Sequence, residues 1–99
     1  MPLATLPLAA AEPLRAAPEL TFTDHAGTVH RLSRYRGQVV LLEFMLTTCP
    51  HCQQTAKLLS RLEREYGPKG FRAVSLAFND DAFQALPAFV KNHQVTHLV

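Results

Sequence analysis

The chain lacks the features that mark several common protein classes. It has no tryptophan, only four glycines and only two cysteines in 99 residues. No apolar run approaches the ~18–20 residues that a membrane-spanning helix needs, because the longest, Val39 to Leu46, is interrupted by Glu43. Two cysteines without a second pair are two ligands short of a structural zinc site. With no internal repeat either, the length predicts a single small domain.

Charge of either sign is also scarce. Ten basic and eight acidic residues give a formal net charge of +2, and 47% of the chain is hydrophobic. This balance is typical of a globular domain rather than of a disordered segment. Acidic residues interrupt most of the basic series, which indicates a solvated surface rather than a nucleic-acid groove. We therefore expect no nucleic acid among the partners.

Residues 1–18 differ in composition from the rest. Prolines at positions 2, 7, 13 and 18 exclude a regular helix. Two interpretations stay open: a flexible Pro/Ala-rich tail, or the remnant of a secretory signal in which 9–11 would be the small-residue cleavage site. The absence of a basic leading region and the proline at position 7 favour the tail. We assign 19–99 to the folded domain.

Hydrophobic patterning over 19–99 predicts an α/β domain. Alternating stretches at 19–23 and 28–32 flank an Asp-His-Ala-Gly turn and predict a β-hairpin. The stretch 38–46 is almost continuously apolar, which predicts a strand buried on both faces, as at the centre of a parallel sheet. Further along, the pattern predicts a helix from about Pro50 to Tyr66, a strand at 71–78, a short helix around Pro87, and a segment from 94 leading toward another strand. The strand–helix–strand part is a βαβ unit.

Side-chain burial follows from the same patterns. The helix is expected to bury an apolar stripe of Thr55, Leu58, Leu59, Leu62 and Tyr66. Five phenylalanines are expected in the core: Phe22, Phe44, Phe71, Phe78 and Phe89. Four histidines are expected at the surface: His25, His30, His93 and His97.

The two cysteines form the motif Cys49-Pro50-His51-Cys52 where the apolar strand meets the long helix. Three interpretations exist: a catalytic dithiol, half of a metal site, or a pair of incidental thiols. A C-x-x-C at the strand-to-helix junction of a βαβ unit favours the dithiol. A copper or zinc carrier that uses the same cysteines, with His51, remains the alternative.

Thiolate chemistry explains the motif. The thiolate is the nucleophile, and a free thiol with a pKa near ~8.5 is mostly protonated at neutral pH. At the helix N-cap, Cys49 meets unpaired backbone N–H groups and the positive end of the helix dipole. His51 adds a group that can carry positive charge, and Pro50 stiffens the turn. We expect Cys49 to attack a substrate and Cys52 to resolve the mixed disulfide.

Glu43 is the only charge in the apolar strand, six residues before Cys49. Buried carboxylates are costly unless they are paired or protonated. One interpretation makes Glu43 the proton acceptor for Cys52. The other places it at a sheet edge where it reaches water. The sequence favours neither.

With these motifs in order, residues 18–99 resemble the thioredoxin-like proteins of the TlpA/ResA kind, which are extracytoplasmic thiol–disulfide oxidoreductases. The resemblance lies in the hairpin, the strand RGQVVLLEF, the C-x-x-C and the strand GFRAVSLAF. It implies a thioredoxin-like α/β fold in which Cys49 and Cys52 are the redox pair and Glu43 the buried acid. It also implies protein thiol or disulfide substrates, a redox partner protein, no bound cofactor and a periplasmic location.

Three residues depart from the family pattern. Thr48 stands where the family has tryptophan, Thr55 where it often has glutamate, and His51 makes the motif similar to that of the oxidising DsbA enzymes. The family also continues beyond the position of Val99 with two strands and a helix, and with a cis-proline that faces the cysteines. We therefore expect an incomplete domain. An inactive truncated domain, a membrane tether through a preceding segment and oligomers through the unpaired sheet edge remain open alternatives.

Overall fold

The computed structural model describes residues 15–99, so most of the predicted tail, residues 1–14, lies outside the described residues. In chain order the elements are β1 (Thr21–Thr23), β2 (Val29–Arg31), the 3-10 helix η3 (Leu32–Tyr35), β3 (Val39–Met45), α1 (Pro50–Tyr66), the 3-10 turn η4 (Gly67–Lys69), β4 (Phe71–Ala77) and α2 (Ala82–Asn92). Every predicted helix and strand is present, and the strands are slightly shorter than predicted. Within the described residues, no helix is long and apolar enough to cross a membrane.

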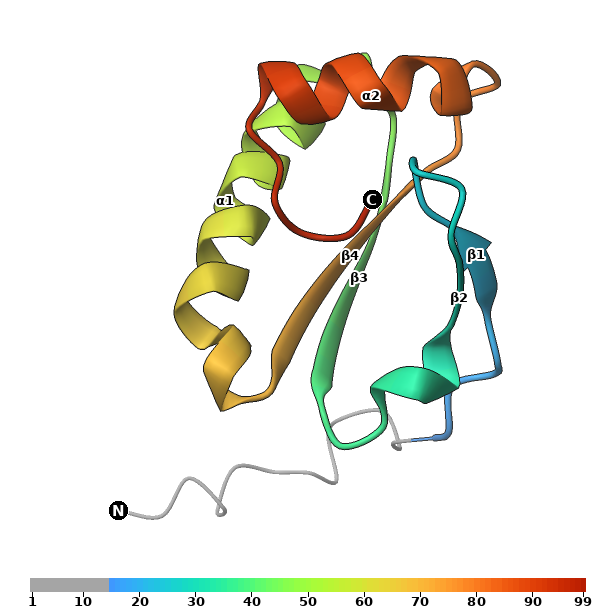
Figure 1. The fold of residues 1–99 in the computed structure, drawn as a ribbon, viewed down its shortest axis with the longest axis vertical. Helices are drawn as coiled ribbons and strands as arrows, with labels where there is room; N and C mark the ends of the chain where they lie inside the picture. Colours follow the sequence, from blue (N-terminus) through green and yellow to red (C-terminus); the bar gives the residue numbers. More distant parts are fainter. Residues whose placement is uncertain (1–14) are drawn as a thin grey trace, which may run out of the picture.

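The elements form three layers, and the parallel pair of strands is the middle layer. β1 and β2 pair antiparallel as the predicted hairpin, and β3 and β4 pair in parallel with Val39 opposite Phe71 and Met45 opposite Ala77. α1 covers one side of the β3–β4 pair, and the hairpin lies on the other (Figure 1). α2 lies across the carboxyl ends of both strands. The start of α1 and the loop that follows β4 therefore lie at the same end of the molecule.

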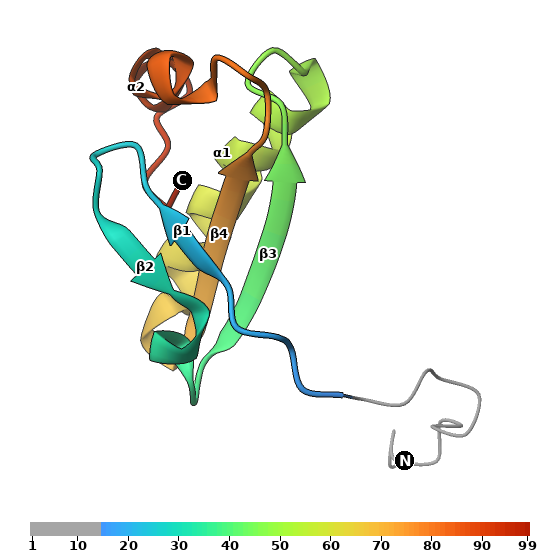
Figure 2. The same ribbon diagram turned by 90° about the vertical axis from the view of Figure 1, so that its right-hand side faces the viewer.

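The prediction that β3 is buried on both faces is wrong. β3 pairs only with β4 among residues 15–99, and its other edge has no neighbour there (Figure 2). Val39 is 70% exposed and Phe44 is 65% exposed. Continuous apolarity indicates that a strand can pack against apolar partners on both faces, but it does not supply those partners. Within the described residues these two side chains are largely exposed.

The buried face of α1 also differs from the predicted stripe. Ala56, Leu59 and Ser60 are buried, whereas Leu58 and Tyr66 are exposed. Ala56 and Ser60 are small, so the helix backbone can approach the sheet closely. The predicted stripe gave weight to large apolar residues, of which Leu59 is buried, and the rest of this buried face consists of the small residues Ala56 and Ser60.

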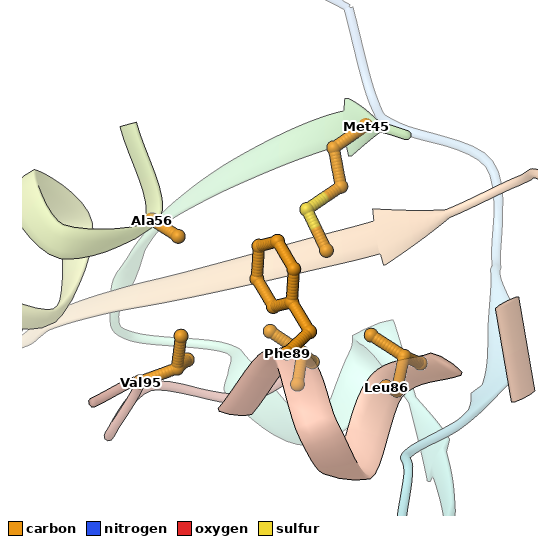
Figure 3. Packing of buried hydrophobic residues seen from close by; sticks show 6 residues of the cluster. Met45, Ala56, Leu86, Phe89 and Val95 are labelled. Atoms are coloured by element: carbon orange, nitrogen blue, oxygen red, sulfur yellow. The ribbon is translucent and has the colours of Figure 1, made fainter. Parts of the chain in front are cut away.

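The hydrophobic core lies where α1 and α2 meet the end of β3. Met45, Ala56 and Phe89 pack together there with Leu86 and Val95 (Figure 3). Cys52 packs against the same cluster. Of the five phenylalanines expected in the core, Phe22 and Phe89 are buried, Phe71 is half-buried, and Phe44 and Phe78 are exposed.

The segment after α2 returns along the sheet, as predicted, but it forms only one bridge. Leu98 lies beside Val74 of β4 in parallel orientation, and Leu98 O accepts a hydrogen bond from Ser75 N at 2.9 Å. Val99 O accepts one from His25 N in the hairpin turn, also at 2.9 Å. Residues 95–99 therefore connect β4 to the hairpin through backbone hydrogen bonds.

Candidate active site

Cys49 is the N-cap residue of α1, and Pro50 is its first helical residue. The backbone of Cys49 is extended, with φ −83° and ψ 120°. Its N–H donates to Leu46 O at 3.2 Å, and its carbonyl accepts from Gln53 N at 3.0 Å. This is the predicted geometry, because proline at the first position leaves the following N–H groups free to face the Cys49 side chain.

The local hydrogen bonds make Cys49 the more acidic thiol. Hydrogen bonding from the backbone N–H of Cys52 lowers the pKa of Cys49 below its usual value, and the Cys52 side chain and the His51 N–H act in the same direction. Burial and the negative charge of Glu43 oppose this effect. The helix start therefore stabilises a thiolate at Cys49.

Cys52 has the opposite character. The largest single influence, a backbone hydrogen bond at Leu46, lowers its pKa. Burial, the hydrogen bond with Cys49 and the negative charges of Cys49 and Glu43 together outweigh it, so the pKa of the Cys52 thiol is raised. Both thiols are free and half-buried. The pair thus combines one thiol poised to ionise with one that holds its proton.

The loop before Cys49 is fastened to the loop after β4. Thr47, which is buried, donates its N–H to Asn79 Oδ1 at 3.1 Å and accepts from Asn79 Nδ2 at its Oγ1 at 2.9 Å. Gln53 Nε2 donates to Thr47 O at 3.2 Å. Neither Asn79 nor the N-cap residue Asp81 caps α2 through a side chain. Asn79 instead holds the active-site loop.

Glu43 lies half-buried in β3, directly opposite Ser75 in the register of the two strands. Its Oε1 accepts a hydrogen bond from Ser75 Oγ at 2.9 Å. Its negative charge is the smallest of the influences on the pKa values of Cys49 and Cys52. Glu43 lies in an edge strand among the described residues, as the second interpretation expected, and its role as proton acceptor for Cys52 stays a prediction.

His51 is exposed on the first turn of α1, and Pro50 is exposed beside it. Four of the predicted site residues thus lie at the start of α1: Cys49, Pro50, His51 and Cys52. Glu43 lies in β3, two residues before the end of that strand. Among residues 15–99, no group of three or more Cys, His, Asp or Glu side chains is arranged to hold a metal ion. A metal carrier would have to rely on the two cysteines with ligands from outside this set.

Sequence reasoning missed the buried polar residues behind the site. His97 was expected at the surface, yet it is 4% exposed and hydrogen-bonded at both ring nitrogens, to Ser60 Oγ at 2.6 Å and to Ser75 Oγ at 2.8 Å. Burial lowers the pKa of His97 to about 4. Its signal in the sequence was weak, because a single histidine between a threonine and a leucine has no spacing that marks it.

Comparison with known proteins agrees with the geometry. Residues 13–99 match the family model described as Redoxin. The chain belongs to the Redoxin family. It is 35% identical over 60 residues to the thiol-disulfide oxidoreductase ResA of Geobacillus kaustophilus, covering 61% of this chain and 34% of ResA. It is also 35% identical over 57 residues to a probable glutathione peroxidase 8-A of Xenopus laevis, covering 58% of this chain and 27% of that protein.

Among solved structures, the chain is similar to a putative thiol:disulfide interchange protein DsbE from Chlorobium tepidum. The two share a TM-score of 0.74 and 26% identity over 84% of this chain and 57% of that one. The expected thioredoxin-like α/β fold and the resemblance to the TlpA/ResA kind are confirmed. This Redoxin-family chain spans about a quarter to a third of the length of these curated relatives and just over half of the DsbE chain.

Proposed function

We propose that this chain is a thiol–disulfide oxidoreductase that exchanges disulfides with protein substrates through Cys49 and Cys52. The observation that carries the proposal is the opposite shift of the two thiol pKa values at one helix start, lowered for Cys49 and raised for Cys52. An attacking thiol must ionise near neutral pH, and a resolving thiol must keep its proton until the mixed disulfide has formed. The ResA and DsbE relatives support the same activity.

In the reducing direction, the Cys49 thiolate attacks one sulfur of a substrate disulfide. A bond forms between Cys49 Sγ and that sulfur, and the other substrate sulfur leaves as a thiolate. Glu43 then takes the proton of Cys52, whose thiolate attacks Cys49 Sγ and releases the second substrate thiol. Two electrons pass from the dithiol to the substrate, and the reverse sequence oxidises a substrate dithiol. No step requires a bound cofactor.

Pro50 and His51 support this chemistry in different ways. Pro50, at the first helical position, fixes the turn between the cysteines. His51 contributes its backbone N–H to the sulfur of Cys49 and an exposed imidazole near it. A thiolate stabilised in the reduced form raises the reduction potential of the pair. This supports an oxidising rather than a strongly reducing role.

A periplasmic location and a protein redox partner complete the proposal. They rest on the resemblance to the TlpA/ResA kind.

Reduction of insulin by the dithiol form tests the proposal, with precipitation of the insulin B chain as the readout. The wild-type chain is expected to accelerate precipitation, and Cys49→Ser to abolish the acceleration. Cys52→Ser is the matched control, since it should form a mixed disulfide but not turn over. The glutathione peroxidase relative supplies a second arm: hydrogen peroxide consumption without insulin reduction would replace this proposal with a peroxidase. Stoichiometric copper or zinc in reduced protein, with neither activity, would replace it with a carrier.

A further inference from the structure

Four polar side chains form one continuous hydrogen-bond chain through the interior. Ser60 Oγ lies 2.6 Å from His97 Nδ1, His97 Nε2 lies 2.8 Å from Ser75 Oγ, and Ser75 Oγ lies 2.9 Å from Glu43 Oε1. Ser60 is 1% exposed and Ser75 is fully buried. The four residues come from α1, the segment after α2, β4 and β3. Because unpaired polar groups at such sites are costly, a complete chain of this kind is a specific arrangement.

The neighbouring groups determine the direction of each hydrogen bond. Ser60 Oγ already accepts the N–H groups of Thr96 at 2.9 Å and of His97 at 3.4 Å, which occupy both of its lone pairs, so its own proton is donated to His97 Nδ1. Ser75 donates to the Glu43 carboxylate and therefore accepts at its oxygen from His97 Nε2–H. His97 is neutral above about pH 4, because burial lowers its pKa to about that value. Every donor thus points toward Glu43.

The chain does not resemble a nucleophile site. Ser60, Ser75 and His97 are all buried, so no substrate reaches either hydroxyl. Glu43 is the last member of this hydrogen-bond chain, and its charge raises the pKa values of the reactive thiols of Cys49 and Cys52. The chain's influence on chemistry therefore passes through the carboxylate.

We propose that His97 is a positioning residue for Glu43: acting through Ser75, it fixes the orientation of the carboxylate on the face of β3 that Glu43 shares with Met45, whose cluster Cys52 packs against. A hydrogen bond from a fixed donor restricts the orientation of a carboxylate, and a second donor behind the first strengthens that bond. The proposal rests on the function proposed above, in which Glu43 accepts the proton of Cys52. It makes residues 95–99 part of the redox site, although none of them touches a cysteine sulfur.

Other titratable groups lie on the elements that meet this hydrogen-bond chain. Cys49 and Cys52 are near the carboxylate, on the start of α1. On the far side, Arg64 of α1 donates to Thr96 Oγ1 at 3.0 Å, next to His97. His25 contacts Val99 only through its backbone N–H, and His93 at the end of α2 packs on Phe89. These groups are the same in all variants that differ only at His97, so they should affect the rate of each variant equally.

Two variants of His97 separate positioning from packing. In His97→Gln the side-chain amide nitrogen can replace Nε2 as donor to Ser75. In His97→Asn the shorter amide can still meet Ser60 but does not reach Ser75. Both remove the imidazole and its packing. Ser75→Ala removes the donor to Glu43 directly and serves as a third variant if one of the others does not fold.

The probe is the mixed disulfide of the full 99-residue chain with thionitrobenzoate. Cys49 reacts with Ellman's disulfide and releases one thionitrobenzoate, and attack of Cys52 on Cys49 Sγ then releases the second. The rate of the second release is measured between about pH 5 and 9. We expect Ser75→Ala to slow the second release about tenfold across this range and to leave the first release unchanged, because misplacing a catalytic group by about 1 Å can cost up to about a hundredfold in rate. His97→Asn should slow the second release in the same way, and His97→Gln should restore the wild-type rate.

Unchanged rates of the second release in Ser75→Ala and His97→Asn would overturn the positioning role, and so would an equal slowing in His97→Gln and His97→Asn. Loss of insulin reduction by the wild-type chain, with the second release and its pH profile intact, would instead contradict the proposed activity on proteins and leave the positioning role in place.

Discussion

Asn79, in the loop after β4, holds Thr47, in the loop before Cys49, at two points. Its Oδ1 accepts the Thr47 N–H at 3.1 Å and its Nδ2 donates to Thr47 Oγ1 at 2.9 Å. The two loops belong to neighbouring parallel strands, so both leave the sheet at the same end. One amide side chain thereby ties the start of α1 to the loop that leads into α2.

Asn79→Ala should therefore destabilise the fold and loosen the redox loop. Leaving the buried Thr47 groups without partners is expected to cost about 1–3 kcal/mol, measured by urea denaturation. Alkylation of Cys49 should also reach its half-maximal rate at a higher pH, because the helix-start donors that lower its pKa are less well held. Asp81→Ala is the control, since it removes only the exposed contact of Asn79. Equal stability in the two variants would contradict the role of the pair.

The two thiols should differ in acidity. Iodoacetamide alkylation of Cys52→Ala, which leaves Cys49 free, should reach its half-maximal rate at a lower pH than alkylation of Cys49→Ala. The reason is that backbone N–H groups at the helix start lower the pKa of Cys49, whereas burial and nearby negative charge raise that of Cys52. Each variant removes the mutual influence of the thiols, so the difference should be smaller than in the intact pair. Identical profiles would refute the assignment of attacking and resolving thiols.

Glu43→Gln should slow resolution of the mixed disulfide more than its formation. If the carboxylate accepts the proton of Cys52, its loss is expected to reduce the resolution rate about a hundredfold, the lower end of what general-base catalysis supplies. The two steps are separable as the first and second release of thionitrobenzoate. Resolution kinetics that match the wild type between about pH 6 and 9 would leave Glu43 a purely structural acid.

His51 should make the pair more oxidising, and the contributions of its backbone N–H and of its imidazole can be tested separately. His51→Gln removes the imidazole but keeps the N–H that faces Cys49, and His51→Pro removes both. A charge at a helix terminus is typically worth under ~1 kcal/mol, and ~30 mV corresponds to ~1.4 kcal/mol, so His51→Gln should lower the potential by about 10–20 mV. His51→Pro should lower it further. A glutathione redox titration measures both, and an unchanged or raised potential in His51→Pro would contradict the prediction.

Acid should destabilise the fold through His97 in a defined pH range. The pKa of His97 is lowered by burial from 6.5 to about 4, so the unfolded chain binds a proton in this range that the folded chain does not. Stability is complete above about pH 6.5 and falls as the pH drops toward 4, by up to about 3 kcal/mol. His97→Gln should lack this loss. Asp24, whose pKa is lowered by its hydrogen bond with His30, acts only at lower pH. Urea titrations at several pH values distinguish the two.

The sequence predicted the elements of the fold and the redox pair because both have local signatures. The sequence predicted α1 from about Pro50 to Tyr66, which are its observed bounds, and the position of Cys49 before Pro50 indicated the N-cap. Burial was harder, because it depends on partners outside the local pattern. Phe44 is as apolar as Met45, yet the first is 65% exposed and the second 1%.

Polar residues behind the site had no local signature at all. Ser60, Ser75 and His97 are separated by at least fifteen positions, and each is unremarkable in its own segment. Only the pairing of β3 with β4, together with the return of the chain after α2, brings them together. Glu43 was found because a lone charge in an apolar strand is conspicuous. Its partners were not found, because serine and histidine are ordinary surface residues.

The sequence separation of the contacts around His97 has a consequence for the order of folding. The Ser60–His97 hydrogen bond joins residues 37 positions apart, and the Ser75–Glu43 hydrogen bond joins residues 32 apart. The hairpin and α1 form through near neighbours, so their loop-closure cost is small, whereas these contacts must wait until distant segments meet. The thiols can therefore occupy a helix start before the carboxylate beneath them has its full set of donors. During folding, Cys49 would acquire its acidity earlier than Cys52 acquires its base.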